Sequence, residues 1–387
     1  MGMPRRLVLV GVIVSLVSVL LIAGCSAARP TKGEIKVFVA VPLSGWQADG
    51  GQTVLGGARL AAEQINARGG LLGYRVVIVP VDDEADSDVA VQVAEQVAEA
   101  VRNGERVLGV IGHYNSGQTG ATLPIYKDLP IIVITPTASD PVLTQQGARN
   151  FFRVNATDAA QGPVDAEFLV KTLGAKRVVL VYAENQYGRG LRDEMVKALE
   201  ALGQPPVEVI GIPEAAETQA PALPSIAAAQ PDAIFLAGYE TEGYVLLPEL
   251  REAGITATFM ASDGCFLYDF IDGSGKWAEG AYVSGITPDP KAVTDAAWWK
   301  AYQKLENRNP GTYSIAGFSA MQVLAEGVKR AQSLQAEAII QALRQIDLQT
   351  PAGRIRFDAK GDLVEQRVYI FQVRNGDFVQ VSPPPKP

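Results

Sequence analysis

Hydroxyl side chains follow two apolar segments of the chain. The run 107–111 (VLGVI) is apolar throughout, which predicts a buried parallel strand, and Ser116 comes shortly after it at the expected start of a helix. A second apolar run, 131–134, leads to Thr137 and Ser139. The carboxyl ends of parallel strands meet at one sheet edge, where helix amino ends present free N–H groups. We therefore predict that Ser116 and Ser139 hold a small carboxylate.

A plainer interpretation of the same residues is local capping. Ser and Thr at helix starts commonly serve as N-caps, and the Thr135-Pro136 pair is a common turn. The hydroxyl pattern alone does not decide between capping and ligand binding, so the rest of the chain must.

Composition excludes several classes of function. The 387 residues are 48% hydrophobic, which is enough for two cored domains. Without residues 1–24 the chain has 32 basic and 42 acidic groups, a net charge of −10, so nucleic acid is a poor partner. The only histidine is His113 and the only cysteines are Cys25 and Cys265. This inventory supports neither a zinc site nor a Ser/His/Asp triad, and we expect no enzyme activity, metal or cofactor.

The amino terminus has the form of an export signal. Arg5 and Arg6 precede the apolar run 7–21, which ends at Ala23-Gly24-Cys25. This end resembles a bacterial lipobox, which predicts cleavage after residue 24 and a lipid on Cys25. An uncleaved anchor helix is the alternative, but the run is at the short limit of about 17 residues for a membrane span. Residues 25–33 then form a tether, and Cys265 is left as a buried filler without a disulfide partner.

Short apolar segments alternate with stretches of helical spacing along the rest of the chain. The first series has expected strands at 35–41, 74–81, 106–111 and 130–134, with expected helices at 51–67, 86–101 and 116–127. The second series has expected strands at 177–182, 207–212, 233–237 and 258–260, with expected helices at 158–173, 188–202, 222–229 and 242–253. This repeated βαβ order predicts an α/β fold of two Rossmann-like lobes, each a parallel sheet flanked by helices.

The carboxyl-terminal part differs from both series. Residues 289–347 have helical spacing almost throughout, and residues 354–381 alternate as strands with turns at 360–362 and 374–377. This is too little material for a third domain. We expect both segments to return and complete the first two lobes.

The ordered set of short motifs resembles a known family. Pro42-Leu43-Ser44-Gly45, Asn66 to Gly70, Ile111-Gly112-His113, Ile134-Thr135-Pro136, Gln186-Tyr187-Gly188, Gly238-Tyr239 and Lys360 to Leu363 occur in the order and spacing of type I periplasmic binding proteins of branched-chain amino acid transporters. The resemblance runs from about residue 35 to residue 378. It implies three crossovers between the lobes, near residues 157, 287 and 367. The implied limits are 34–157 plus 288–367 for lobe one and 158–287 plus 368–387 for lobe two.

The resemblance also implies the ligand site. The hydroxyl after the third strand falls on Ser116, and the loop that holds the ligand carboxylate falls on Thr137 and Ser139. Two aromatic positions of the second lobe fall on Tyr187 and Tyr239. The acid that takes the ligand ammonium falls on Asp263, where branched-chain binders commonly carry Glu, so this site has one methylene less.

Trp46 departs from the family pattern in the first loop. It is expected either to wall the specificity pocket or to be a core aromatic after a turn, and the sequence does not choose between the two.

The resemblance predicts that the protein captures a free amino acid, Leu, Ile or Val, and delivers it to the permease of an ABC transporter. The protein is expected to be a monomer, held on the outer side of the cell membrane by its lipid. One alternative is a ligand-binding sensor for a chemoreceptor or kinase, and another is a binder of amides, urea or aromatic acids. A hydrolase or dehydrogenase is disfavoured by the single histidine and by the lack of a G-x-S-x-G elbow or a complete phosphate loop.

Overall fold

Two β-sheets organise the molecule. A computed structural model describes residues 29–384, so the predicted signal peptide and Cys25 lie outside the described residues. The first sheet has the order β2-β1-β3-β4-β5 and is wholly parallel. Its strands are β1 Glu34–Val41, β2 Arg75–Asp82, β3 Val107–Gly112, β4 Ile132–Thr135 and β5 Phe151–Arg153.

The second sheet has the order β14-β13-β10-β9-β8-β6-β7. The strands from β10 to β7 are parallel, whereas β13 is antiparallel to both β10 and β14. The bounds are β6 Val178–Ala183, β7 Glu208–Ile212, β8 Ala233–Ala237, β9 Thr258–Ala261, β10 Tyr282–Gly285, β13 Tyr369–Arg374 and β14 Asp377–Ser382, and a separate hairpin pairs β11 Leu348–Thr350 with β12 Gly353–Ile355.

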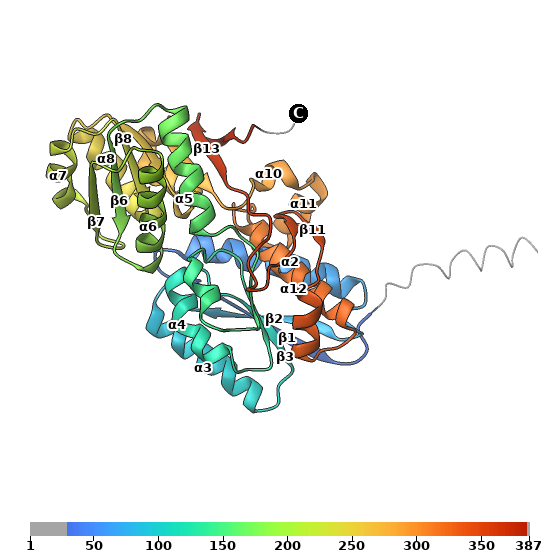
Figure 1. The fold of residues 1–387 in the computed structure, drawn as a ribbon. Coiled ribbons are helices and arrows are strands. Elements are labelled where there is room, and N and C mark those ends of the chain that lie inside the picture. The colour runs from blue at the N-terminus through green and yellow to red at the C-terminus, as the bar shows by residue number, and fades with distance from the viewer. Residues whose placement is uncertain (1–28, 385–387) are drawn as a thin grey trace, which may run out of the picture.

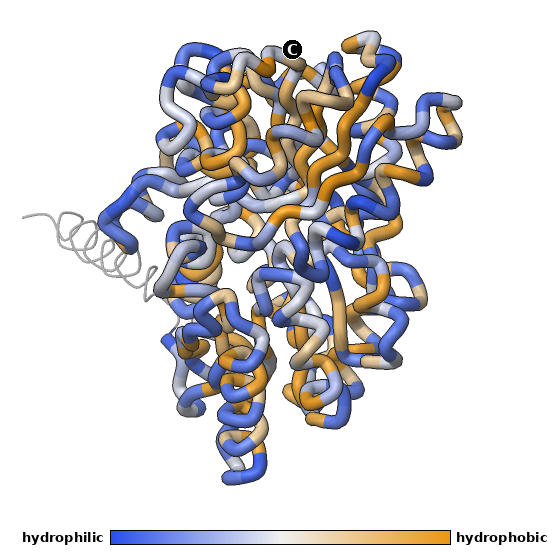
Figure 2. The backbone as a smooth tube through the Cα atoms, turned by 90° about the vertical axis from the view of Figure 1, so that its left-hand side faces the viewer, coloured by the Kyte–Doolittle hydropathy of each residue, from blue (hydrophilic) through white to orange (hydrophobic). Residues whose placement is uncertain are grey.

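Helices cover both faces of each sheet, as Figure 1 shows. Their bounds are α2 Ala48–Ala67, α3 Ser87–Arg102, α4 Ser116–Tyr126, α5 Asp158–Glu167, α6 Gln186–Ala201, α7 Leu223–Ala228, α8 Glu240–Glu252, α9 Tyr268–Ser274, α10 Pro290–Val293, α11 Ala296–Glu306, α12 Ser314–Ala331 and α13 Ala336–Leu343. Strands such as β4 and β8 are buried along their whole length, because both of their faces are covered. Figure 2 shows apolar strand segments inside the molecule and hydrophilic segments along outer helices and turns.

The contact between α2 and α12 is close because glycines lie in it. A Cβ atom at Gly57 would lie 1.8 Å from the carbonyl oxygen of Ser314, and one at Gly317 would lie 2.0 Å from that of Val54. Only glycine permits this approach of two backbones. The contact packs the late helix α12 into the same core as β1 and α2.

The chain passes between the two sheets three times. It leaves the first sheet after β5, returns after β10 to the helices and core that cover that sheet, and joins the second sheet again at β13. Helices α11 and α12 therefore lie beside α2, whereas β13 lies in the second sheet (Figure 1). The predicted fold of two lobes with three crossovers is confirmed.

Several local predictions needed correction. Helix α2 begins at Ala48, before the expected residue 51, and short strands such as β10 were not foreseen. Residues 356–368 were expected to continue the strand pattern, but the structure gives them only an isolated bridge between Phe357 and Leu363. This segment carries the third crossover, so its alternating apolar residues pack against neighbouring elements without forming a ladder. Among residues 29–384, no helix is both long and apolar enough to cross a membrane.

Candidate functional site

A small, partly open cavity lies where strands of the two sheets end. Its volume is about 20 Å³, and it is lined by Tyr114, Asn115, Ser116, Thr137, Ala138, Ser139, Tyr187, Tyr239, Asp263, Gly264 and Tyr313. Six of the seven predicted ligand residues are in this set. We call Ser116, Thr137 and Ser139 the hydroxyl side, because they follow strands of the first sheet. Tyr187, Tyr239 and Asp263, which follow strands of the second sheet, are the acid side.

Ser116 presents a hydrogen-bond donor on the hydroxyl side. It begins helix α4 and is fully buried. Its Oγ accepts two hydrogen bonds, from the backbone N–H groups of Ser139 and Asp140, each at 3.2 Å. Since a hydroxyl oxygen has two acceptor positions, its own hydrogen remains free to donate. Ser116 can thus give a hydrogen bond to an anion in the cavity.

Thr137 is held differently from Ser116. Its hydroxyl donates to the carbonyl oxygen of Tyr114 at 2.5 Å, so this hydrogen is already used inside the protein. The Thr135 hydroxyl accepts the N–H of Ala138 at 3.0 Å and donates to the carbonyl oxygen of His113 at 2.9 Å. The 137–140 loop is therefore fixed by hydrogen bonds within the protein.

Asp263 is the single acid of the cavity lining. It lies in a 3₁₀ turn just after β9, and only 4% of its surface is exposed. The Tyr187 hydroxyl donates to its Oδ1 at 2.5 Å. Burial raises the pKa of Asp263 to about 6, against the opposing effect of its hydrogen bonds. Burial also raises the pKa of Asp158 and of Asp165. The negative charge of the nearby Asp263 adds to the rise at both residues.

The tyrosines of the acid side form an aromatic stack. The rings of Tyr187 and Tyr239 stack with centroids 5.0 Å apart, and Trp46 meets Tyr239 edge-on at 5.6 Å. Trp46 comes from the loop after β1, so the first lobe contacts the second through this ring. It is outside the cavity lining and half-buried against the core around Tyr239. The structure therefore places Trp46 behind the cavity wall.

Other lining residues were not foreseen from the sequence. Tyr114 and Asn115 directly precede Ser116, and this position at a strand end was the available signal. Tyr313 had no comparable local signal. It lies before α12, and its hydroxyl donates to the carbonyl oxygen of Asp263 at 2.6 Å. Tyr313 also meets Tyr114 edge-on at 5.7 Å, so it closes the cavity from the returning helical block.

The lobes are held together across the cavity. The Gln186 side chain at the start of α6 donates to Asp140 Oδ2 at 2.7 Å. A cleft of about 560 Å³ adjoins the cavity and shares Tyr187 and Tyr239 with it, and its other walls come from both lobes, including Gln118 and Arg189. The cavity itself has room for about one water molecule. A larger guest would therefore require the lobes to part, and this cleft is its natural approach.

The remaining reactive side chains are engaged in packing. The buried His113 ring contacts Asp83 through Nδ1 at 2.7 Å and the Tyr126 hydroxyl through Nε2 at 3.1 Å, so His113 is a packed residue, as predicted. Cys265 is a free, buried thiol. Within the described range, no group of three or more His, Cys, Asp or Glu side chains is arranged to hold a metal ion.

Comparison with known proteins gives one consistent family. Residues 34–377 match the sequence model of the family described as periplasmic binding protein. A leucine-, isoleucine-, valine-, threonine- and alanine-binding protein of Pseudomonas aeruginosa is 31% identical over 348 residues, which cover 88% of this chain and 90% of the relative. A leucine-specific-binding protein of Salmonella typhimurium is 30% identical, with 91% and 95% covered.

Solved structures agree in fold. A leucine-binding protein of Thermotoga maritima superposes with a TM-score of 0.81 at 27% identity, covering 90% of this chain and 98% of that one. An ABC transporter substrate-binding protein of Desulfitobacterium hafniense, solved in complex with Leu, gives a TM-score of 0.75 at 25% identity, with 90% and 100% covered.

Proposed function

Because the chain belongs to the periplasmic binding protein family, in its type I branch of branched-chain amino acid binders, we propose that it captures free leucine, isoleucine or valine outside the cytoplasm. The protein is a substrate-binding component of transport and not an enzyme. The observation that carries the choice of ligand is the opposition of Ser116 and Ser139 to a buried Asp263 across one cavity.

This opposition suits an amino acid because its two charged ends differ. The hydroxyl side offers donors for the carboxylate, and Asp263 offers an acceptor for the ammonium. Each charged hydrogen bond contributes about 1.5–3 kcal/mol, and burial of an aliphatic side chain about 1.5–3 kcal/mol. Micromolar binding needs about 8 kcal/mol, so both ends must be held at once.

Capture requires motion of two lobes. We assign residues 34–157 plus 288–367 to lobe one and residues 158–287 plus 368–387 to lobe two. Lobe one takes the carboxylate in the open form, and lobe two then closes on the ammonium. A ligand shifts this equilibrium only through its higher affinity for the closed form, so ligand residues from both lobes are needed. The hydrogen bond between Gln186 and Asp140 is a contact between the lobes that would stabilise the closed form.

Delivery and anchoring complete the proposal. The protein is exported, cleaved before Cys25 and held at the membrane by lipid on that cysteine, with residues 25–33 as the tether. The closed monomer then passes its ligand to the permease of an ABC transporter.

A second ligand class is favoured by one contact. The Tyr187 hydroxyl already occupies Asp263 Oδ1, and four tyrosines line the cavity. A carboxylate ligand without an ammonium, such as an aromatic acid, would leave that contact intact.

Calorimetric titration distinguishes the two classes. Residues 26–387 are unfolded and refolded to remove carried-over ligand, then titrated with amino acids, simple amides and aromatic acids. Saturable binding of leucine, isoleucine or valine at micromolar concentration or below is the expected result. Binding restricted to ligands without an α-ammonium would contradict the assignment of Asp263 and of the ligand class.

A further inference from the structure

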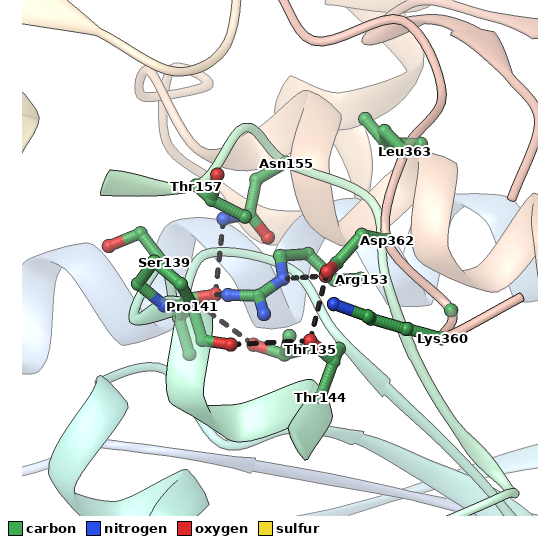
Figure 3. Close-up of polar contacts among 12 residues, drawn as sticks. Thr135, Ser139, Pro141, Thr144, Arg153, Asn155, Thr157, Lys360, Asp362 and Leu363 are labelled. Atoms are coloured by element: carbon green, nitrogen blue, oxygen red, sulfur yellow. Dashed lines mark hydrogen bonds and ion pairs between the residues drawn. The ribbon is translucent and has the colours of Figure 1, made fainter. Parts of the chain in front are cut away.

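A fully buried arginine lies behind the hydroxyl side of the cavity. Arg153 ends β5, none of its side-chain surface is exposed, and it is outside the cavity lining. Its Nη1 donates to the carbonyl oxygens of Ala138 and Asp140, each at 3.0 Å, while its Nε donates to Asp362 Oδ1 at 2.7 Å. Figure 3 shows the guanidinium between Asp362 and the 137–140 loop.

All four carbonyl oxygens of the 137–140 loop are bonded by residues 153–158. Arg153 takes those of Ala138 and Asp140, and the Asn155 side chain takes that of Thr137 at 3.1 Å and shares that of Ala138 at 3.2 Å. The N–H of Asp158 donates to the carbonyl oxygen of Ser139 at 3.0 Å. The carbonyls are thus held away from the cavity.

The N–H groups at the two ends of the loop have different acceptors, and that of Ala138 donates to the Thr135 hydroxyl at 3.0 Å. Those of Ser139 and Asp140 donate to Ser116 Oγ, which turns the Ser116 hydrogen toward the cavity. An anion is attracted by N–H and O–H groups and repelled by carbonyl oxygens. The contacts of Arg153 and Asn155 therefore set the polarity that an anion meets.

Asp362 reaches Arg153 from the third crossover. Gly361 has a φ of +102°, and a Cβ atom there would lie 2.4 Å from the carbonyl oxygen of Phe151, so only glycine lets this segment lie against β5. The N–H of Arg153 donates to the carbonyl oxygen of Gly361 at 3.0 Å. The second carboxylate oxygen of Asp362 accepts the Thr144 hydroxyl at 2.9 Å. Asp362 is thus fixed from both sides when it pairs with the arginine.

A buried guanidinium without a counter-charge is unfavourable, so loss of Asp362 would drive Arg153 toward other acceptors or water. The acceptors already in its reach are the loop carbonyls. Disturbance of the ion pair is therefore transmitted first to the 137–140 loop.

We propose that Arg153 and Asp362 are positioning residues for the ligand carboxylate, because their buried ion pair holds the 137–140 loop where the N–H groups of Ser139 and Asp140 orient the Ser116 hydroxyl. They act through the loop and do not touch the ligand. The inference rests on the proposed function for the identity of that anion, but the orientation of the loop is a property of the protein without ligand.

Hydrogen exchange of the ligand-free protein tests the orientation directly. Asp362→Asn keeps the shape of the side chain and removes its charge. Arg153→Lys keeps the charge, but an ammonium cannot replace the planar fork that reaches Asp362 and two carbonyls. Both variants are expected to speed exchange in the peptide that covers residues 137–140 by about tenfold or more. Thr144→Val, which leaves the ion pair intact, should give a smaller increase.

The matched control is the exposed ion pair of Asp347 with Arg354 in the same carboxyl-terminal segment. Asp347→Asn is expected to leave exchange of the 137–140 peptide unchanged. Leucine titration of the same proteins gives the second readout, with an expected rise in Kd of about 10- to 100-fold for Asp362→Asn and none for Asp347→Asn.

The outcomes separate the two proposals. Unchanged exchange of the 137–140 peptide in Asp362→Asn and Arg153→Lys would overturn the positioning role, and so would uniform acceleration across both lobes. Faster loop exchange with unchanged leucine affinity would also overturn it, because the loop would then not serve the carboxylate. A wild-type protein with no affinity for any amino acid would contradict the proposed function, and the exchange result would then decide the loop orientation by itself.

Discussion

The two sides of the cavity are suited to binding charged groups by different physical means. The hydroxyl side uses neutral groups whose directions are fixed by internal hydrogen bonds, as at Ser116 Oγ. The acid side uses one ionisable group, Asp263, whose charge is opposed by burial. Donors that are already oriented cost little when an anion arrives. A buried carboxylate is unfavourable until a cation joins it.

This contrast means that the two sides should respond differently to change. Mutations on the hydroxyl side remove a fixed donor and act similarly at every pH near neutrality. Changes at Asp263 alter a titrating group, so their effect depends on pH.

Removal of the acid should nearly abolish capture. Asp263→Ala is expected to weaken leucine binding by about 2–5 kcal/mol, because a buried ammonium would be left without its partner. Calorimetric titration at pH 7.5 measures the change. Asp193→Ala, which removes an exposed acid of the same lobe, serves as the control and should bind like the wild type. Unchanged affinity in Asp263→Ala would remove this residue from the site.

Removal of a fixed donor should have the next largest effect. Ser116→Ala loses the hydroxyl predicted to meet the carboxylate and is expected to cost about 1.5–3 kcal/mol of leucine binding, to a similar extent at pH 6 and pH 8. The control is Thr122→Val on the same helix, because that buried hydroxyl bonds only to helix carbonyls. Equal leucine affinity of the two variants would show that the Ser116 hydroxyl serves helix capping and not ligand binding.

Binding should weaken in mild acid. The pKa of Asp263 in the free protein is about 6, so below that pH the ligand ammonium must displace a proton. Affinity is expected to be level above pH 7 and to fall by up to about tenfold per unit below pH 6. Titrations from pH 5 to pH 8 in buffers of different ionisation enthalpy would also detect the released proton. A flat profile would show that Asp263 does not meet the ammonium.

The same group has the opposite effect on stability without ligand. A carboxyl with a raised pKa binds more protons folded than unfolded between its usual range near pH 4 and pH 6. Its contribution to the free energy of unfolding therefore decreases as pH rises through that window. Denaturant unfolding of wild type and Asp263→Asn would show this difference. Equal pH dependence in the two proteins would contradict a raised pKa at this position.

The smallest effect is expected at the aromatic contact between the lobes. Trp46→Leu removes the edge-on contact with Tyr239 and should destabilise the closed form by about 0.5–1.5 kcal/mol. The radius of gyration from small-angle X-ray scattering, measured with subsaturating leucine, would rise slightly. A change of selectivity among leucine, isoleucine and valine would instead place Trp46 in the pocket wall.

Local sequence signals sufficed for the strands and loops of the hydroxyl side. The apolar runs before Ser116 and Thr137 are continuous, and short loops follow them, so their shared sheet edge could be inferred. On the acid side, pattern alone favoured turns and ordinary aromatics, and the family resemblance supplied Tyr187, Tyr239 and Asp263. Their roles toward a ligand remain predictions.

Local sequence patterns could not predict the contacts between segments that are distant in the chain. Tyr313 reaches Asp263 only because α12 returns to α2, and no local pattern encodes that return. Arg153 and Asp362 are 209 residues apart, and each reads locally as an ordinary charged residue. The four-residue strand β10 is similarly defined by its neighbours. Tertiary packing determines these two contacts and this strand.

In the proposed mechanism, one cavity holds both charged ends of an amino acid. This mechanism is tested most directly by titration of wild type and Asp263→Asn with leucine and with 4-methylpentanoate, which has the same carbon chain and carboxylate but no ammonium. Wild type is expected to prefer leucine by about 100-fold or more, and this preference is expected nearly to disappear in Asp263→Asn. Equal affinity of wild type for both ligands, or an undiminished preference in the variant, would contradict it.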